Sequence, residues 1–294
     1  MGKPIFIAGA TATGKSAVAQ EVAKKIGGEI ISVDSMQVYR KMDIGTAKPT
    51  AEQREQTPHH IIDCTTISEG FDAARFVREA ENKKTKIEHQ IFCGGTGLYF
   101  QAWLEGLGEA PSGDSKIRKV LEETPTQDLL RELKEKDPST HKSIDHQNPR
   151  RIIRAIEVIR ITDRPFSEQK AKWTNQAPAN FFLLERADQD LRKRIESRAE
   201  KMFERGLVEE TCSLRTELEN NPSAQQALGY RQVIGHLRGE QSLPETINLV
   251  KSRTWQYAKR QKTWFRKIRG AIEVKAAEAE LEKETAQRII DLIE

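Results

Sequence analysis

Eight residues near the N-terminus have the spacing of a phosphate-binding loop. The stretch from Gly9 to Ser16 reads Gly-Ala-Thr-Ala-Thr-Gly-Lys-Ser and fits the pattern G-x-x-x-x-G-K-[ST] completely. Its glycines let the backbone curl so that successive N–H groups face one anion, and the following helix adds the positive end of its dipole. Lys15 offers a positive charge to phosphate oxygens, and Ser16 offers a hydroxyl to Mg²⁺. The loop therefore predicts a site for a di- or triphosphate.

An acidic residue follows the second expected strand of the chain, and none follows the third. A motor or switch NTPase needs an acidic residue for Mg²⁺ and a residue that positions water. The strand at residues 90–93 instead runs into Gly94-Gly95-Thr96-Gly97, whereas Asp34 comes directly after the strand at residues 29–33. This arrangement favours an enzyme that transfers a phosphoryl or another group.

Basic residues gather in two stretches of a chain whose net charge is only +4. Between Lys251 and Arg269 there are eight basic residues and no acidic one, and aromatic side chains are interleaved with them. Such a combination suits single-stranded nucleic acid, although a charge run is also typical of a solvated helix face. The tail from residue 271 onward is acidic. The second basic stretch consists of Arg150, Arg151, Arg154, Arg160 and Arg164.

Composition excludes several classes of protein. The 294 residues suffice for one large or two modest domains. No run approaches the ~18 apolar residues of a membrane span, and the apolar stretch at residues 4–10 is too short for a signal peptide. The three cysteines have neither disulfide nor metal-ligand spacing. We expect a soluble, cytoplasmic protein without a membrane partner.

The elements that must position these residues alternate between strand and helix. Short apolar strands are expected at residues 4–8, 29–33, 90–93 and 180–186, with helices at 15–26 and 71–84. Such alternation predicts a parallel sheet covered by helices. Longer helices follow at residues 188–205, 207–219 and 244–268.

The segment from residue 113 to residue 179 differs, since it is rich in charge and almost lacks strand patterns. Helices are expected at residues 114–123, 126–136 and 149–161, with prolines between them. The predicted fold is therefore α/β, a P-loop parallel sheet flanked by helices, with a mostly α-helical insertion domain at residues 113–179. The catalytic core is then discontinuous and consists of residues 1–112 and 180–294.

Seven short motifs, in order along nearly the whole chain, resemble the tRNA dimethylallyltransferase (tRNA isopentenyltransferase, or IPP transferase) family. The tail has no cysteine or histidine for the zinc finger of some eukaryotic members, which favours the bacterial type. The motifs are Asp34–Tyr39, Met42–Pro49, Pro58–His60, Gly94–Tyr99, Asn148–Arg151 with Arg154–Glu157, Leu228–Gln232 and Lys259–Arg266.

The resemblance implies a reaction in which a dimethylallyl group passes from its diphosphate to the exocyclic N6 amine of the adenine just 3′ of the tRNA anticodon. Diphosphate leaves, and the family uses Mg²⁺, for which Ser16 is the candidate ligand. In the family's scheme Asp34 takes the amine proton, Thr96 orients the amine, and Arg118 contacts the substrate. The implied diphosphate-binding residues are Gly9, Thr11, Ala12, Thr13, Gly14, Lys15, Ser16 and Arg231.

The resemblance also implies a surface for the anticodon stem-loop. Some members carry an arginine where this chain has Gln226, so Arg231 is the candidate to supply that charge. Any single arginine could instead form an ion pair within the protein. We expect a monomer. The implied tRNA-binding residues are Asp34, Ser35, Met36, Gln37, Thr96, Arg118, Arg150, Arg151, Arg154, Gln226, Arg231, Lys259, Arg260 and Arg266.

Two other functions fit parts of the pattern. The first is a P-loop kinase of small molecules in which the helical insertion acts as a lid. The second is a non-catalytic RNA-binding protein with a relic phosphate loop. The basic stretches argue against the kinase, because a small acceptor needs no such surface.

Overall fold

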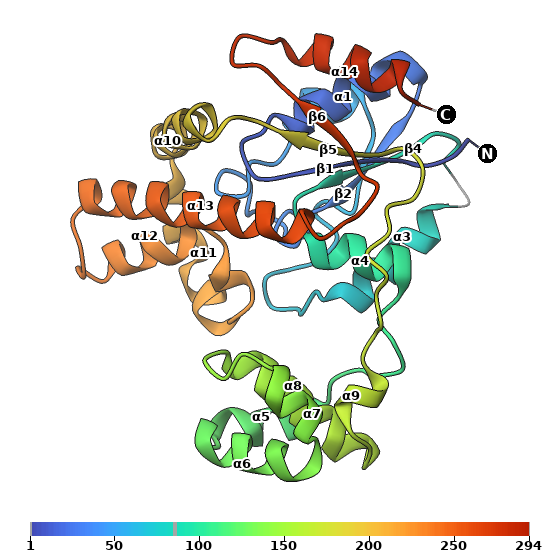
Figure 1. The fold of residues 1–294 in the computed structure, drawn as a ribbon. Helices are drawn as coiled ribbons and strands as arrows, with labels where there is room; N and C mark the ends of the chain where they lie inside the picture. The colour runs from blue at the N-terminus through green and yellow to red at the C-terminus, as the bar shows by residue number, and fades with distance from the viewer. Residues whose placement is uncertain (1, 85–86, 294) are drawn as a thin grey trace. The chain divides into compact units, whose positions relative to one another are not determined.

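The chain divides into two compact units, which Figure 1 traces from the N-terminus to the C-terminus. The structure is a computed structural model that describes residues 2–84 and 87–293. One unit combines residues 1–104 with residues 175–294, and the other consists of residues 105–174. The sequence analysis predicted the helical insertion at residues 113–179, so its predicted boundaries fall after residues 112 and 179.

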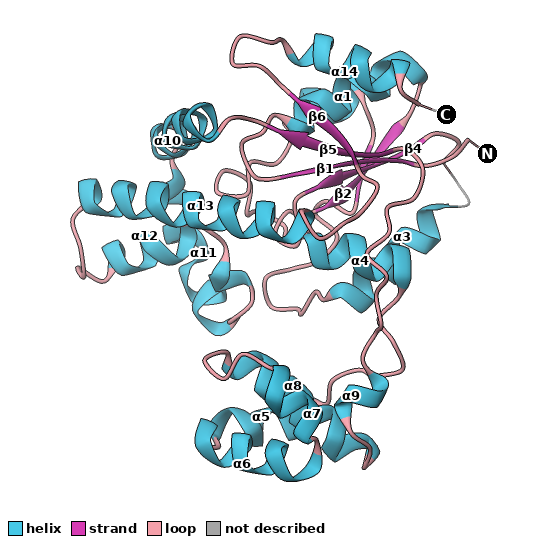
Figure 2. Ribbon diagram, viewed as in Figure 1, coloured by secondary structure: helices cyan, strands magenta, loops and turns pink. Residues whose placement is uncertain are grey.

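A parallel sheet forms the centre of the first unit, which confirms the predicted α/β class (Figure 2). The strand order is β3-β2-β4-β1-β5-β6, and every described pair is parallel. Because all strands point the same way, their carboxyl ends meet at one edge of the sheet. The strands are β1 (Ile5–Gly9), β2 (Glu29–Val33), β3 (His59–His60), β4 (Gln90–Gly94), β5 (Phe181–Glu185) and β6 (Ile272–Lys275).

Side chains alternate between the two faces of the sheet, and helices cover both faces. Ile5 and Ile7 of β1 pack in a buried cluster with residues of α1 and α14. Phe6, between them, stacks on Phe92 of β4 at 5.2 Å and on Phe181 of β5 at 5.8 Å, measured between ring centroids. Strands buried on both faces read as continuous apolar runs, which explains why the sequence pattern located β1, β4 and β5.

The α-helices of the first unit differ in length, from the 6 residues of α2 to the 23 residues of α13. Among the described residues, none of the chain's helices has the length and apolar character needed to cross a membrane. The helical elements are α1 (Lys15–Ile26), α2 (Ala51–Gln56), α3 (Ala73–Lys84), α4 (Gly97–Glu105), α10 (Asp188–Glu204), α11 (Leu207–Asn220), the short η1 (Ala224–Gln226), α12 (Tyr230–Leu237), α13 (Leu243–Phe265) and α14 (Glu282–Asp291).

The second unit is a small helical bundle with its own apolar core, in which Leu121, Leu133, Ile152 and Ile156 are fully buried. Asp137 ends one helix and begins the next: its buried carboxylate accepts hydrogen bonds from the backbone N–H of Thr140 at 2.9 Å and of Ser167 at 2.7 Å. The helices are α5 (Ser115–Glu123), α6 (Thr126–Lys136), α7 (Pro138–Ser143), α8 (Pro149–Thr162) and α9 (Phe166–Gln169).

Candidate active site

The phosphate loop connects β1 to α1 at the carboxyl edge of the sheet. Gly14 caps the N-terminus of α1 with φ at 96°, a left-handed conformation that suits glycine. Thr13 is buried, and its Oγ1 donates to the carbonyl oxygen of Ala10 at 2.9 Å. The ammonium of Lys15 donates to the same carbonyl oxygen at 3.2 Å. The loop is thus folded around its own lysine, with the N-terminus of α1 behind it.

Three arginines from one segment hold three successive residues of this loop. Arg186, just after β5, donates through Nε to the carbonyl oxygen of Thr13 at 2.8 Å. On α10, Arg194 donates to the carbonyl oxygen of Ala12 at 3.1 Å, and Arg198 donates to Thr11 Oγ1 at 3.2 Å. Asp190 pairs with Arg186 at 2.9 Å, and Glu282 lies 3.5 Å from Arg194.

Arg198 is different, because no described carboxylate lies within ion-pair distance of it. Burial lowers the pKa of Arg198, although the charge of Asp34 acts in the opposite direction. Burial also lowers the pKa of Lys15, and the charge of Asp34 acts in the opposite direction. The pKa of Cys93 is raised to about 12 by burial, so its thiol stays protonated at neutral pH. The site therefore holds two cations whose charge an anionic ligand would balance.

Asp34 and Thr96 meet at the carboxyl edge because β2 and β4 are neighbouring strands. Asp34 Oδ1 accepts hydrogen bonds from the backbone N–H of Met36 at 2.8 Å and of Gln37 at 3.2 Å. Thr96 Oγ1 accepts one from the N–H of Ser35 at 3.1 Å. The turn after β2 therefore fixes one carboxylate oxygen and leaves the other, Oδ2, without a hydrogen-bond partner among the described residues.

Gln261 of α13 joins the phosphate loop to the end of β4. Its Oε1 accepts from the N–H of Thr11 at 2.8 Å, and its Nε2 donates to the carbonyl oxygen of Gly95 at 2.9 Å. The side chain is buried, so both bonds are shielded from water. Gln261 lies in the motif Lys259–Arg266, but the sequence analysis did not identify it as a site residue. Nothing in the sequence indicates that this neutral amide lies between the two loops.

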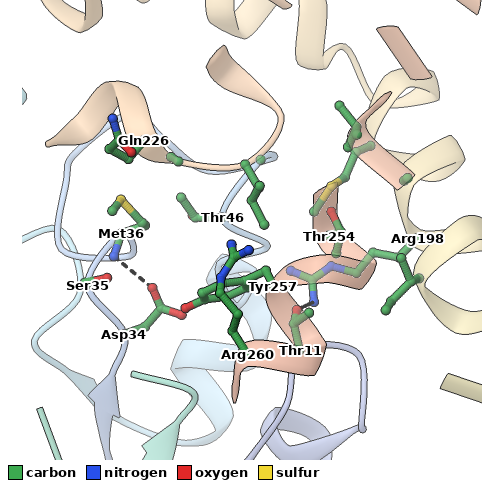
Figure 3. A pocket seen from close by; sticks show the side chains of 17 residues that line it. Thr11, Asp34, Ser35, Met36, Thr46, Arg198, Gln226, Thr254, Tyr257 and Arg260 are labelled. Atoms are coloured by element: carbon green, nitrogen blue, oxygen red, sulfur yellow. Dashed lines mark hydrogen bonds between the residues drawn. The ribbon is translucent and has the colours of Figure 1, made fainter. Parts of the chain in front are cut away.

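One cavity of about 290 Å³ opens onto these groups. In Figure 3 Asp34, Tyr257 and Arg198 are seen lining it, with Arg198 bonded to Thr11. Burial raises the pKa of the Tyr257 phenol above its usual value, and the nearby charge of Asp34 adds to the effect. Thr11 and Asp34 contribute polar groups to the lining of the cavity. Its apolar lining comes from Met36, Ile195, Ala199, Met202, Leu228 and Val250.

Further predicted site residues lie around this cavity. Ser35, Met36, Gln226 and Arg260 line it, and Arg260 lies over the ring of Tyr257 at 5.8 Å. Gln37 is turned away and donates to the carbonyl oxygens of residues 46 and 47. Three predicted residues are exposed to solvent and are not part of the cavity's lining, namely Arg231, Lys259 and Arg266.

In the helical unit, Glu157 brings two of the predicted arginines together. Glu157 is fully buried, and its Oε2 accepts from Arg118 and from Arg154, each at 2.7 Å. Arg154 also donates to the carbonyl oxygen of Pro111 at 2.6 Å. Burial favours the neutral acid, but the hydrogen bonds from both arginines outweigh it and hold the pKa of Glu157 below its usual value.

Two other arginines of this unit, Arg150 and Arg151, are exposed in the first turn of α8. In the basic stretch at residues 150–164, Arg154, Arg160 and Arg164 form ion pairs with carboxylates of the protein, and Arg150 and Arg151 are exposed. The sequence alone did not show which arginines form such pairs.

The fold and the cavity together define a P-loop enzyme of the group-transfer class, since the loop can hold a diphosphate while Asp34 faces the same cavity. A model of the family described as IPP transferase matches residues 37–268. The chain is 42% identical to tRNA dimethylallyltransferase 1 of Citrifermentans bemidjiense over 90% of its length and 89% of that protein's. It is 40% identical to the tRNA dimethylallyltransferase of Acetivibrio thermocellus, covering 91% of this chain and 90% of that protein. The protein belongs to the IPP transferase family.

Solved structures agree. The full-length tRNA isopentenylpyrophosphate transferase of Bacillus halodurans superposes with a TM-score of 0.71 and 34% sequence identity, covering 99% of this chain and 95% of that one. A eukaryotic dimethylallyltransferase described as acting on tRNA superposes with a TM-score of 0.78 and 26% identity, covering 99% of this chain and 80% of that one.

Proposed function

We propose that the protein transfers the dimethylallyl group of dimethylallyl diphosphate to the N6 amine of the adenine 3′-adjacent to the anticodon in tRNA, and releases diphosphate. The observation that carries the proposal is the single cavity lined by Thr11 of the phosphate loop, Arg198 and Asp34. One site thus contains groups that can stabilise an anionic leaving group and a carboxylate that can accept the proton of the nucleophile. Family membership supplies the substrates.

Asp34 is the proposed general base. As the bond between the amine nitrogen and the first carbon of the dimethylallyl group forms, the bond from that carbon to the diphosphate oxygen breaks. The amine proton passes to Asp34 Oδ2, since Oδ1 is occupied by two backbone N–H groups. Thr96 accepts a hydrogen bond from the N–H of Ser35, in the turn after Asp34, and orients the amine.

The phosphate loop takes up the charge of the leaving diphosphate. Backbone N–H groups of residues 12–16, the N-terminus of α1 and the ammonium of Lys15 stabilise the negative charge that grows as the carbon–oxygen bond breaks. Arg198 adds a second cation from α10. Since it bonds to Thr11 Oγ1, it lies within reach of the same phosphate groups.

We propose that Mg²⁺ accompanies the diphosphate. Ser16 and Lys15 both line the open cleft beside the loop, so the hydroxyl that would hold the ion lies next to the ammonium that holds the phosphates. Mg²⁺ commonly takes one or two protein ligands together with substrate phosphates and water, which fits this arrangement. When bound, the ion would neutralise part of the charge on the leaving group.

The tRNA is proposed to bind through the anticodon stem-loop. An adenine held in a loop must be turned out of its stack to reach a cavity, as other base-modifying enzymes require. Ser35, Met36, Gln226 and Arg260 line the cavity and would contact the extruded base and its neighbours. Backbone phosphates are proposed to meet the helical insertion through Arg118, Arg150, Arg151 and Arg154, and the core through Arg231, Lys259 and Arg266. The protein is proposed to act as a cytoplasmic monomer.

Incubation of the protein with dimethylallyl diphosphate, Mg²⁺ and unmodified tRNA tests the proposal. Nucleoside analysis by mass spectrometry should reveal prenylated adenosine in a tRNA digest, and omission of the diphosphate should abolish it. The proposal fails if no prenylated adenosine forms while ATP is consumed with a small-molecule acceptor, because that result describes a kinase.

A further inference from the structure

Two of the family motifs, Met42–Pro49 and Leu228–Gln232, contain no residue that takes part in the proposed transfer step; Arg231, in the second motif, is proposed only to contact tRNA. The structure joins them through Glu210 on α11. Its carboxylate accepts hydrogen bonds from successive backbone N–H groups, of Asp43 at 3.1 Å, of Ile44 at 3.0 Å and of Gly45 at 3.4 Å. Successive N–H groups that converge in this way form a concave anion site, and here a carboxylate of the protein occupies it.

Tyr230, from the second motif, completes this contact. Its hydroxyl donates to Glu210 Oε1 at 2.5 Å and accepts from the N–H of Gly45 at 3.2 Å. The ring is fully buried, and a Cβ added at Gly45 would lie 2.3 Å from it. Only glycine therefore lets the loop approach the ring so closely. We call Glu210 and Tyr230 the clamp, and residues 42–48 the clamped loop.

The far end of the clamped loop is fixed independently. Lys48 is buried, and its ammonium contacts Asp43 at 2.7 Å, Asp63 at 2.5 Å and the carbonyl oxygen of Tyr39 at 2.5 Å. Since Lys48 holds one end and the clamp holds residues 43–45, the middle of the loop has a defined place. Gly45 and Thr46, in that middle part, line the cavity that contains Asp34.

A chain of hydrogen bonds leads from the clamped loop to the proposed base. The carbonyl oxygens of Thr46 and Ala47 accept from Gln37 Nε2 at 3.2 and 3.3 Å. The backbone N–H of Gln37 in turn donates to Asp34 Oδ1 at 3.2 Å. Ser32 donates to Gln37 Oε1 at 2.9 Å, so the side chain of Gln37 is held on both sides. The rotamer of Asp34 thus depends on a turn that the clamped loop supports.

We propose that Glu210 and Tyr230 are positioning residues for the transfer reaction: they hold the clamped loop so that Gln37 orients the Asp34 carboxylate and Gly45 and Thr46 shape the cavity wall. This inference rests on the proposed function, since it concerns the base of that reaction. Misplacement of a catalytic group by about 1 Å can cost two orders of magnitude in rate. Neither Glu210 nor Tyr230 lines the cavity or contacts Asp34, so the proposed effect passes through the clamped loop.

Two conservative substitutions test the clamp. Glu210→Gln keeps the shape of the side chain but replaces one acceptor oxygen with an NH₂ group, which faces the loop's N–H groups or the tyrosine hydroxyl. Tyr230→Phe keeps the ring beside Gly45 and removes only the hydroxyl. Glu209→Gln is the matched control, because Glu209 is exposed on the same turn of α11 and carries the same charge.

The readout is steady-state transfer of the dimethylallyl group to tRNA, together with the melting temperature of each variant. We expect kcat to fall about tenfold or more in Glu210→Gln and by a smaller factor in Tyr230→Phe, with KM for both substrates within about twofold of the wild type. The double variant should be no slower than Glu210→Gln alone, because the two side chains act as one unit. Glu210→Asp should recover part of the rate, since it restores the charge.

Several results would overturn the positioning role: an unchanged kcat in a folded Glu210→Gln, an equal fall in Glu209→Gln, or a change in KM alone. If Glu210→Gln does not fold, Tyr230→Phe decides by the same measurements. A wild-type protein that transfers no prenyl group refutes the proposed function and the positioning role with it. An active wild type with equally active variants refutes the positioning role alone.

Discussion

The cations at the phosphate loop and those in the helical unit have opposite surroundings. In the core, Lys15 and Arg198 have no carboxylate within ion-pair distance among the described residues, and burial lowers the pKa of both. In the helical unit, Arg118 and Arg154 share the buried carboxylate of Glu157. A cation held without a counter-ion costs stability and is ready for an anionic ligand, whereas a paired cation costs less and is held in place by its carboxylate.

This difference suggests a division of labour between the two units. The core would carry the chemistry, because Arg198 lines the cavity that also contains the carboxylate of Asp34, and Lys15 lines a neighbouring cleft that shares Arg198. The helical unit would contribute binding through arginines whose side chains Glu157 holds in place. The predictions below separate the two roles by asking which substitution changes the rate and which changes only affinity.

The largest effect is expected for Asp34→Asn. Removal of a general base costs about 10²–10⁴-fold in rate, while the amide still fits the turn that holds it. Single-turnover transfer should fall by that factor, and tRNA affinity should stay within a few fold. A variant as fast as the wild type would show that the core's carboxylate is not the base.

Arg198→Met should affect the diphosphate donor and not tRNA. Loss of a charge-assisted hydrogen bond is worth about 1.5–3 kcal/mol, which corresponds to about 10–100-fold in affinity for inorganic diphosphate. Calorimetric titration measures this affinity. Arg192→Met is the control, because Arg192 lies on the same helix and pairs with Glu196. Equal losses in the two variants would contradict a specific role for Arg198.

Arg154→Met should affect the binding of tRNA and not that of the diphosphate donor. We expect tRNA affinity to fall several fold and the dependence of log Kd on log salt to become shallower by about one unit, since one phosphate contact is lost. The KM for the dimethylallyl donor should not change. Filter binding over a range of salt concentrations measures the slope. An unchanged slope would mean that Arg154 serves only its ion pair with Glu157.

The smallest effect concerns pH and the stability of the helical unit. Because the pKa of Glu157 is lower in the folded protein than its usual value of 4.5, its ion pairs stabilise the fold fully above that value. The stabilisation is lost as pH falls through the lowered pKa. The opening free energy of α5 and α8, obtained from hydrogen exchange in the full chain after correction for the intrinsic exchange rate at each pH, should therefore fall below about pH 4.5, and Glu157→Gln should weaken this dependence. An identical pH profile in the variant would contradict this.

Much of the fold was predictable because the central strands are buried on both faces. The pattern placed β1, β2, β4 and β5 within about two residues, an accuracy typical of strongly apolar runs. The C-terminal tail was not predictable in this way. Its acidic surplus conceals β6, an edge strand, and α14, whose Ala286 and Ile289 pack in the same cluster as α1. That packing is a tertiary contact, and no local sequence pattern indicates it.

Site residues that follow neighbouring strands were predictable, because the topology of the sheet brings them together. Site residues on helices were not, because their position depends on which face of the helix meets the phosphate loop. Asp34 and Thr96 follow neighbouring strands, and parallel strands bring such residues to one edge. Sequence reasoning missed Arg194 and Arg198, because a charged helix is typical of a solvated surface and the pattern does not reveal which face meets the phosphate loop. Their spacing of four residues, one helical turn, was the only available signal.

The most direct measurement compares two anticodon stem-loops that differ only in the purine 3′-adjacent to the anticodon. One carries adenine, and the other carries hypoxanthine, in which an oxygen replaces the exocyclic amine. With radiolabelled dimethylallyl diphosphate, the wild-type protein should label the adenine stem-loop alone, and Asp34→Asn should label neither at a comparable rate. Equal labelling of both stem-loops, or none in the wild type, would contradict transfer to the N6 amine.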